Sequence, residues 1–243
     1  YEQSYHVLRN NLLVTLKLVD WLRVADWRPA VVVFASSSEA YAGAVTLGVA
    51  PVPTPEDVPL VVVNPRNPRW SYGGSKLADE LIALNGLRDV GIPPLLARYH
   101  NVYGPRMGFD HVVSEFCLRA ARRETPFRVF GAEQTRTYCY VDDAVDATVR
   151  LAASPEAYGL TVNVGAPGPE VTALELAQEL FDLIGWHPPV ELHPAPAGSV
   201  ERRCPNLGLL TQLVGFTPLH DLRTGLATTY EWHEARYAPA LRG

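Results

Sequence analysis

The sequence predicts an α/β protein built on a doubly wound parallel sheet, and three observations support this fold class. Residues 31–34 and 95–99 are short, continuous apolar runs, which are typical of strands buried on both faces of a parallel sheet. Segments with helical spacing alternate with these runs, as they do in βαβ units. The 243 residues are 47% hydrophobic and 19% charged, so the chain can bury a sizeable core.

Each further element follows from a local pattern. Apolar residues recur at helical spacing between residues 8 and 24, which predicts a helix there. Residues 49–68 are rich in proline and have no regular period, so a long loop is expected. The capping-box pattern Thr172-Ala-Leu-Glu175 opens a helix that runs to about residue 184. The other helices expected lie at 74–87, 112–123, 143–153, 207–213 and 222–237.

Charge argues against a nucleic-acid surface. The formal net charge is −5, and the basic residues form only two short clusters, Arg119, Arg122 and Arg123, and Arg202 and Arg203. Small basic clusters on an acidic chain favour local anion sites, although solvated surface charge would look the same. We therefore expect no nucleic-acid partner.

Cysteine and hydropathy patterns point to the cytoplasm. Cys117, Cys139 and Cys204 are odd in number and widely spaced, which favours reduced thiols over disulfides or a zinc site. The seven histidines show no metal-ligand spacing, so no metal is expected. No apolar run reaches the length of a membrane span and no signal peptide is visible, so no membrane partner is expected.

The sharpest chemical signal is Tyr72-Gly-Gly-Ser-Lys76 at the start of a predicted helix. Residues four apart lie on one face of a helix, so the phenol and the ammonium are neighbours. Free tyrosine titrates near ~10 and is a poor base at neutral pH. A nearby ammonium favours the phenolate and lowers its pKa. The pair therefore predicts a tyrosine that accepts a proton, although the pattern alone is short and common.

A second signal follows the first predicted strand. Ser36, Ser37, Ser38 and Glu39 come where that strand ends. In a parallel sheet the carboxyl ends of the strands face the ligand crevice, so these side chains are expected at the site. A polar turn after a strand would also explain them.

In the same order along the chain, six stretches resemble the NAD-dependent epimerase/dehydratase family of extended short-chain dehydrogenases. The clearest are Phe34-Ala-Ser-Ser-Ser-Glu-Ala-Tyr41, Pro68-Arg-Trp-Ser-Tyr72-Gly-Gly-Ser-Lys76 and Arg98-Tyr-His-Asn101-Val-Tyr-Gly-Pro-Arg106. The others are residues 134–143, 163–165 and 202–205, and Asn11-x-x-x-Thr15 resembles the helix before the serine strand. The resemblance implies a Rossmann-type NAD-binding domain and a smaller, mostly C-terminal substrate domain.

The resemblance also implies roles. Tyr72 would be the catalytic base, Lys76 would lower its pKa and bind the nicotinamide ribose, and Ser37 would hydrogen-bond the reacting oxygen. Glu39 and Arg136 would complete the catalytic group. The NAD-binding residues implied are Ser36, Tyr72, Lys76, Tyr99 and Asn11. The residues implied to bind a nucleotide sugar, with a UDP-sugar expected, are Ser38, Asn101, Arg136, Arg203 and Val112.

Domain limits and assembly are implied in the same way. Residues 1–108 and 140–168 would form the remainder of the NAD-binding domain, and 109–139 and 169–243 the nucleotide-sugar domain. A homodimer would form through a four-helix contact that uses helices like 8–24 and 74–87.

Members of the family share oxidation at the sugar C4 and differ in the next step. Ser37-Ser38-Glu39 resembles the Thr-Ser-Glu of UDP-glucuronate decarboxylases, and Pro68-Arg-Trp-x-Tyr72 and Gln134-x-Arg136 also look closest to them. Decarboxylation of UDP-glucuronate to a UDP-pentose is therefore favoured. A 4-epimerase and a 4,6-dehydratase stay open, although dehydratases usually carry Asp where Ser38 stands.

The family begins with a Gly-x-x-Gly-x-x-Gly turn over the cofactor pyrophosphate, and no such turn stands here. The chain opens at Tyr1, and Met107 is its only methionine. We expect further residues upstream. The alternative is a nucleotide-sugar-binding remnant without NAD binding.

Overall fold

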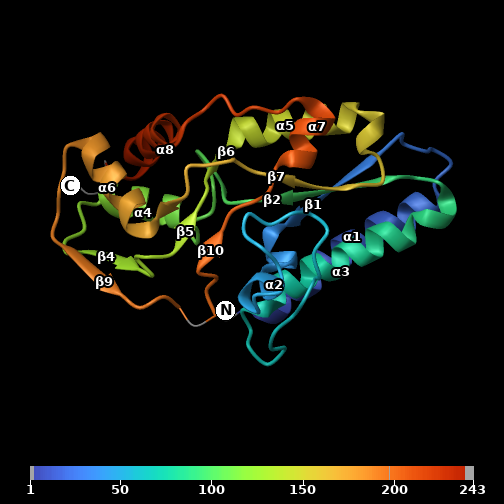
Figure 1. The fold of residues 1–243 in the computed structure, drawn as a ribbon, viewed down its shortest axis with the longest axis horizontal. Coiled ribbons are helices and arrows are strands. Elements are labelled where there is room, and N and C mark those ends of the chain that lie inside the picture. The colour runs from blue at the N-terminus through green and yellow to red at the C-terminus, as the bar shows by residue number, and fades with distance from the viewer. Residues whose placement is uncertain (1–2, 197, 239–243) are drawn as a thin grey trace. The chain divides into compact units, whose positions relative to one another are not determined.

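A computed structural model describes residues 3–196 and 198–238 (Figure 1). The chain divides into two compact units, each made of three segments. The first consists of Tyr1–His100, Val145–Val164 and Pro205–Thr217. The second consists of Asn101–Ala144, Gly165–Cys204 and Pro218–Gly243. Whether these units correspond to the predicted cofactor and sugar domains stays a prediction.

The first unit is built on a parallel three-stranded sheet in the order β1-β2-β7. Its strands are β1 (Val32–Ser37), β2 (Pro94–Tyr99) and β7 (Thr161–Val164). Its helices are α1 (Ser4–Val24), α2 (Ala42–Thr46), α3 (Trp70–Gly86), α5 (Val141–Ala153, whose first turn belongs to the second unit) and α7 (Gly208–Val214). Short 3₁₀-helices lie at Ser38–Ala40, Arg88–Val90 and Pro155–Ala157.

Helices α1 and α3 lie side by side, and α3 packs against β1 and β2 of the sheet (Figure 1). A Cβ on Gly86 would lie 2.5 Å from Cγ1 of Val19, so only glycine permits this close approach of the two helices. The core between them and the sheet contains Val19, Leu22, Phe34, Ala83, Leu87, Ile92 and Leu96. Strand β2 is buried along almost its whole length, as expected for the middle strand of a parallel sheet.

The second unit combines three helices with short strand pairs. Its helices are α4 (Val112–Ala121), α6 (Ala173–Ile184) and α8 (Leu222–Tyr237). Its strands are β3 (Val102–Tyr103), β4 (Phe127–Phe130), β5 (Thr135–Arg136), β6 (Cys139–Tyr140), β8 (Val171–Thr172), β9 (Val190–His193) and β10 (Arg202–Arg203). They pair as β3-β6, as β4-β9 and as a three-stranded sheet β10-β5-β8.

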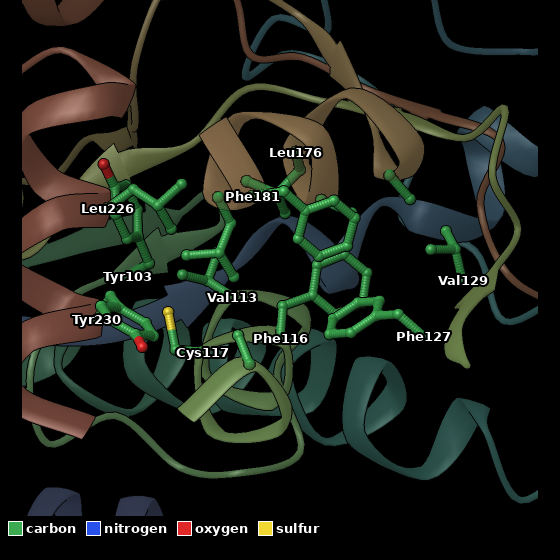
Figure 2. Close-up of a cluster of buried hydrophobic side chains, with 14 of the residues drawn as sticks. Tyr103, Val113, Phe116, Cys117, Phe127, Val129, Leu176, Phe181, Leu226 and Tyr230 are labelled. Atoms are coloured by element: carbon green, nitrogen blue, oxygen red, sulfur yellow. The ribbon is translucent and has the colours of Figure 1, made fainter. Parts of the chain in front are cut away.

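Aromatic side chains organise the core of the second unit, as Figure 2 shows. Phe127 packs edge to face against Phe116 of α4 and Phe181 of α6, with ring centroids 5.2 and 4.9 Å apart. Pairs in this geometry contribute about 0.5–1.5 kcal/mol beyond the area that they bury. Helix α6 begins with the predicted capping box, since the Thr172 and Glu175 side chains each bond the other residue's backbone N–H.

The predicted α/β class and parallel sheet are confirmed. Several boundaries were wrong: α1 begins at Ser4 rather than at residue 8, β1 runs from Val32 to Ser37 rather than over 31–34, and α3 begins at Trp70 rather than at residue 74. The side chain and carbonyl of Asn67 accept the backbone N–H groups of Arg69 and Trp70, which fixes the turn that leads into the helix. This start outweighs the low helix propensity of Gly73 and Gly74.

The helices in the described part of the chain include none with both the length and the apolar character needed to cross a membrane.

Candidate active site

The predicted tyrosine and lysine lie in the first two turns of α3. The Lys76 ammonium lies 5.9 Å from the centroid of the Tyr72 ring, and the Tyr72 residue is 39% exposed. Lys76 Nζ also donates to the carbonyl oxygen of Ala35 in β1 at 2.9 Å and lies 3.5 Å from Asp79 Oδ2. These contacts hold a positive charge between α3 and the end of β1, beside a phenol that solvent can reach.

The three serines occupy different positions at the end of β1. Ser36 is buried and donates to Glu80 Oε1 at 2.5 Å. The hydroxyl of Ser37 accepts the backbone N–H of Glu39 at 3.2 Å and so caps the following 3₁₀-helix. Ser38 is buried in the first position of that 3₁₀-helix. Ser37 therefore shapes the turn itself, while Ser36 ties the strand to α3.

Glu39 is held against the first turn of α3 by two contacts. Arg69 Nη2 lies 3.3 Å from Glu39 Oε2, in an ion pair that is largely buried on both sides. A Cβ on Gly73 would lie 2.7 Å from the carbonyl oxygen of Glu39, so the two backbones meet where only glycine fits. The structure thus brings Glu39 and the turn that carries Tyr72 together.

A buried ion pair between β2 and α3 holds these elements together. Arg98 of β2 donates from Nε and Nη2 to both carboxylate oxygens of Glu80 in α3, at 2.8 and 2.7 Å. Arg98 Nη1 donates to the carbonyl of Glu56 in the proline-rich loop at 2.8 Å. With Ser36 on the same carboxylate, Glu80 joins β1, β2 and α3.

The sequence analysis assigns no role to Glu80 or Arg69, although Arg69 lies in the Pro68-Arg-Trp-x-Tyr72 stretch. Glu80 stands four residues after Lys76, which places both on one face of α3. The pairing of Arg98 with Glu80 could have been predicted from two signals. One is the carboxylate at residue 80 on that face of the helix, and the other is an arginine within the buried strand 95–99.

The other predicted cofactor residues of the first unit have partners within the protein. Asn11 Nδ2 donates to Ser75 Oγ at 2.8 Å, which ties α1 to α3 beside Tyr72. The Tyr99 hydroxyl lies 2.8 Å from Thr148 Oγ1 of α5. In the register of the sheet, Tyr99 is paired with Ser37.

The predicted substrate residues of the second unit surround β5. Arg203 of β10 is paired in register with Arg136 of β5. Arg136 donates from Nη1 to the carbonyls of Thr135 and Glu201 at 2.7 and 3.0 Å, and from Nη2 to that of Val200. These bonds fix its guanidinium.

Asn101 and Val112 complete the second group. Asn101 Nδ2 donates to the carbonyl of Thr137 at 2.9 Å, next to β5, and Val112 is the first residue of α4. Desolvation raises the pKa of Tyr138 to about 12, and the positive charges of Arg136 and Arg203 act in the opposite direction. Both guanidinium groups are therefore close enough to Tyr138 to influence its ionisation.

The described residues include no cluster of His, Cys, Asp and Glu side chains suited to a metal ion. All three cysteines are buried, and burial raises the pKa of the Cys117 thiol to about 12.

Residues 1–165 match the model of the NAD dependent epimerase/dehydratase family. With a parallel sheet and a Tyr-x-x-x-Lys pair on the helix beside it, the chain belongs to this family, and the resemblance seen in its motifs is confirmed.

Within this family, the chain is similar to two decarboxylases and to one solved epimerase structure. UDP-glucuronic acid decarboxylase 3 from Arabidopsis thaliana is 34% identical over 166 residues, which are 68% of this chain and 48% of the relative. UDP-N-acetyl-alpha-D-glucosaminuronate decarboxylase from Bacillus cytotoxicus is 32% identical over 211 residues, 83% of this chain and 63% of the relative. The chain thus spans about half the length of the first of these relatives.

The solved structure is the UDP-glucose 4-epimerase from Thermotoga maritima with UDP-glucose. It superimposes with a TM-score of 0.82 at 26% identity, over 95% of this chain and 71% of its own length.

Proposed function

We propose that the protein is an NAD-dependent enzyme that oxidises a nucleotide sugar at C4 and then decarboxylates it, converting UDP-glucuronate into a UDP-pentose. The observation that carries the proposal is the Lys76 ammonium 5.9 Å from the Tyr72 ring, at the end of the strand that bears Ser37. The similarity to two decarboxylases of UDP-uronates supports the choice of substrate.

Tyr72 is proposed to take the proton of the C4 hydroxyl. Lys76 stabilises the phenolate that performs this step, because a positive charge nearby favours the ionised phenol. Ser37 is proposed to hydrogen-bond the same sugar oxygen. A base placed in this way contributes about 10²–10⁴ in rate.

The residues at the end of β1 suit the ribose of NAD. An ammonium and hydroxyl groups lie together there, and these are the donors that ribose oxygens accept. Lys76 and Tyr72 would hold the ribose. Asn11, Ser36 and Tyr99 would line the ribose site, where their hydrogen bonds to Ser75, Glu80 and Thr148 hold them in place. When bound, NAD supplies the hydride acceptor.

The 4-ketone turns the C6 carboxylate into a β-keto acid, from which CO₂ leaves with the bonding electron pair left on the sugar. The C4 oxygen gains negative charge in this step, and Tyr72 and Ser37 are proposed to stabilise it by hydrogen bonds. Glu39 is proposed to position the sugar ring. The solvent then supplies a proton to C5. Tyr72 is proposed to return its proton to the C4 oxygen as the hydride is returned to C4, which yields the UDP-pentose and leaves no net change of oxidation state in the cofactor.

The second unit is proposed to bind the anionic parts of the substrate. Guanidinium groups pair well with phosphate and carboxylate oxygens, which suits Arg136 and Arg203. Arg136 would hold the sugar carboxylate or direct a water to C5. Asn101, Ser38 and Val112 would complete the nucleotide-sugar contacts.

A 4-epimerase is the second candidate, because the chain is similar to a solved UDP-glucose 4-epimerase. Such an enzyme would share the oxidation by Tyr72 and return the hydride to the other face of the ketone. One experiment separates the two: the complete protein is given NAD with UDP-glucuronate or UDP-glucose. Release of CO₂ with a UDP-pentose supports the decarboxylase, and interconversion of UDP-glucose and UDP-galactose supports the epimerase. A 4-keto-6-deoxy sugar from dTDP-glucose or GDP-mannose would support a dehydratase.

We also propose a homodimer and a cytoplasmic location. Helix α1 presents exposed apolar side chains, among them Val14, Leu16 and Trp21, and α3 presents Leu81. Pairing these helices with those of a second copy would cover them. Three buried cysteines that form no disulfide among the described residues suit a reducing compartment. Light scattering of the purified protein tests the dimer.

A further inference from the structure

We infer that Arg69 is a positioning residue that holds Glu39 as a carboxylate and withholds it from the hydrogen at C5 of the sugar. This inference rests on the proposed function and deepens it, because it concerns which reaction follows oxidation. Arg69 contacts Glu39, not the reacting atoms.

The Arg69 guanidinium is fixed on several sides. It is buried, its Nη2 lies 3.3 Å from Glu39 Oε2, and its Cζ lies 4.6 Å from the centroid of the Trp70 ring. Trp70 is itself buried in the first turn of α3. Cation–π contacts of this kind favour the charged guanidinium over the ring. Arg69 therefore presents a fixed positive charge to Glu39.

One nitrogen of the Arg69 guanidinium lacks a hydrogen-bond partner among the described residues. Arg69 Nη1 is buried and has no hydrogen-bond partner among the residues that the structure describes. Since a buried N–H without a partner costs about 1–3 kcal/mol, an apolar side chain at this position would avoid that cost. The arginine is therefore better explained by its charge beside Glu39 than by packing alone.

Glu39 cannot move away from this charge easily. The carbonyl oxygen of Glu39 lies where a Cβ on Gly73 would be only 2.7 Å away, and the N–H of Glu39 donates to Ser37 Oγ. Its backbone is held on both sides, so its carboxylate stays within reach of Arg69.

The chemistry gives this pair a purpose. The C5–H of a 4-keto sugar is acidic, and a free carboxylate could take that proton and leave the electron pair in an enolate. Dehydration requires this step, whereas decarboxylation breaks the C5–C6 bond instead and keeps the original C5 hydrogen. A carboxylate bound to a guanidinium gives up that partner if it is protonated, so it is the weaker base. Arg69 thus favours loss of CO₂.

The test uses the complete protein with NAD and UDP-glucuronate deuterated at C5. In the wild-type product we expect full retention of the label, with the second C5 hydrogen taken from water. In Arg69→Gln, loss of label should rise at least about tenfold, since a general base contributes about 10²–10⁴ in rate. Mass spectrometry of the pentose nucleotide gives the retention.

Two further variants identify the base. Arg69→Lys keeps the positive charge and should retain the label as the wild type does. Glu39→Gln added to Arg69→Gln should restore retention. Label loss in the wild type, wild-type retention in a folded Arg69→Gln protein, or loss that persists in the double variant would each overturn the inference. If Arg69→Gln forms no product, the label is measured in the recovered sugar nucleotide, and full retention there overturns the inference too.

Failure of the proposed function has a different signature. A wild-type protein that leaves UDP-glucuronate unchanged refutes the decarboxylase. The label is then followed in whichever nucleotide sugar the protein does oxidise, deuterated at C5, with the same variants. If it oxidises none, both the proposed function and the inference fail.

Discussion

Arg98 donates two parallel hydrogen bonds to the carboxylate of Glu80, from Nε at 2.8 Å and from Nη2 at 2.7 Å, inside the first unit. Both side chains are about 95% buried or more. Removing one partner of such a pair leaves a buried charge unpaired. Glu80→Ala should therefore lower the free energy of unfolding by about 3–5 kcal/mol, measured by urea titration.

The matched control is Asp146→Ala, which removes the partner of Arg150 in a half-exposed ion pair on α5. Exposed pairs contribute about 0–1 kcal/mol, so this change should be small. Equal losses in the two variants would contradict a special role for the buried pair.

Gly73 and Gly74 offer a comparison between neighbours. A Cβ at residue 73 would lie 2.7 Å from the Glu39 carbonyl oxygen, whereas at residue 74 it would make an ordinary 3.5 Å contact with Val62. Gly73→Ala should displace the turn that carries Tyr72, and a misplacement of about 1 Å can reduce catalysis about 10²-fold. Gly74→Ala should keep a rate close to that of the wild type and gain up to about 1 kcal/mol of helix stability. Steady-state rates and melting temperatures check both, and similar rates for the two variants would refute the steric argument.

Tyr72→Phe should reduce the rate of sugar oxidation by about 10²–10⁴, because the proton of the C4 hydroxyl loses its acceptor. Binding of UDP-glucuronate should change little, since only one hydroxyl is removed. Single-turnover absorbance of the reduced cofactor measures the first quantity and calorimetry the second. Tyr158→Phe is the control, because that hydroxyl donates to the carbonyl of Ala152 and has no proposed role. A comparable loss in both variants would remove Tyr72 from the mechanism.

His233 of α8 predicts a pH dependence of stability. Its Nε2 lies 2.9 Å from Ser114 Oγ of α4 and its Nδ1 2.9 Å from the carbonyl of Thr229. Burial lowers the pKa of His233 below its ordinary 6.5, and the bond to Thr229 acts in the opposite direction. The folded state therefore prefers the neutral ring. The contribution of the neutral His233 ring to the free energy of unfolding is present above about pH 6.5 and is lost as the pH falls below that value.

The melting temperature of the second unit should thus fall on acidification from about pH 7 to about pH 5, and His233→Gln should flatten this slope. Exposed His187 supplies the control, His187→Gln, which should leave the slope unchanged. An unchanged slope in His233→Gln would show that other groups set the acid sensitivity.

Strong local signals were enough to predict the main elements and part of the site. The helix expected at 222–237 is α8, the strand expected at 95–99 is β2 with one residue more, and the Thr172 capping box opens α6. Strand β7 was missed, because Thr161-Val-Asn-Val164 is short and carries a buried polar residue, Asn163, that breaks the apolar run.

The contacts around Glu39 show what a single sequence leaves out. Tyr72 and Lys76 are four residues apart, so their proximity follows from helix geometry alone. Arg69 and Glu39 lie thirty residues apart, and their pairing depends on how α3 packs against the end of β1. Contacts of this kind come from tertiary structure, which no local pattern encodes.

The order in which the parallel sheet is written along the chain has a consequence for synthesis. Strand β2 lies between β1 and β7, but the chain passes through residues 101–144 of the second unit before it reaches β7. Helix α7, which packs on β7, comes later still. A ribosome adds about 5–20 residues per second, so the apolar surface of β2 waits several seconds for its second neighbour. Nascent chains that stop before residue 164 should therefore be bound by chaperones for longer than those that reach residue 217.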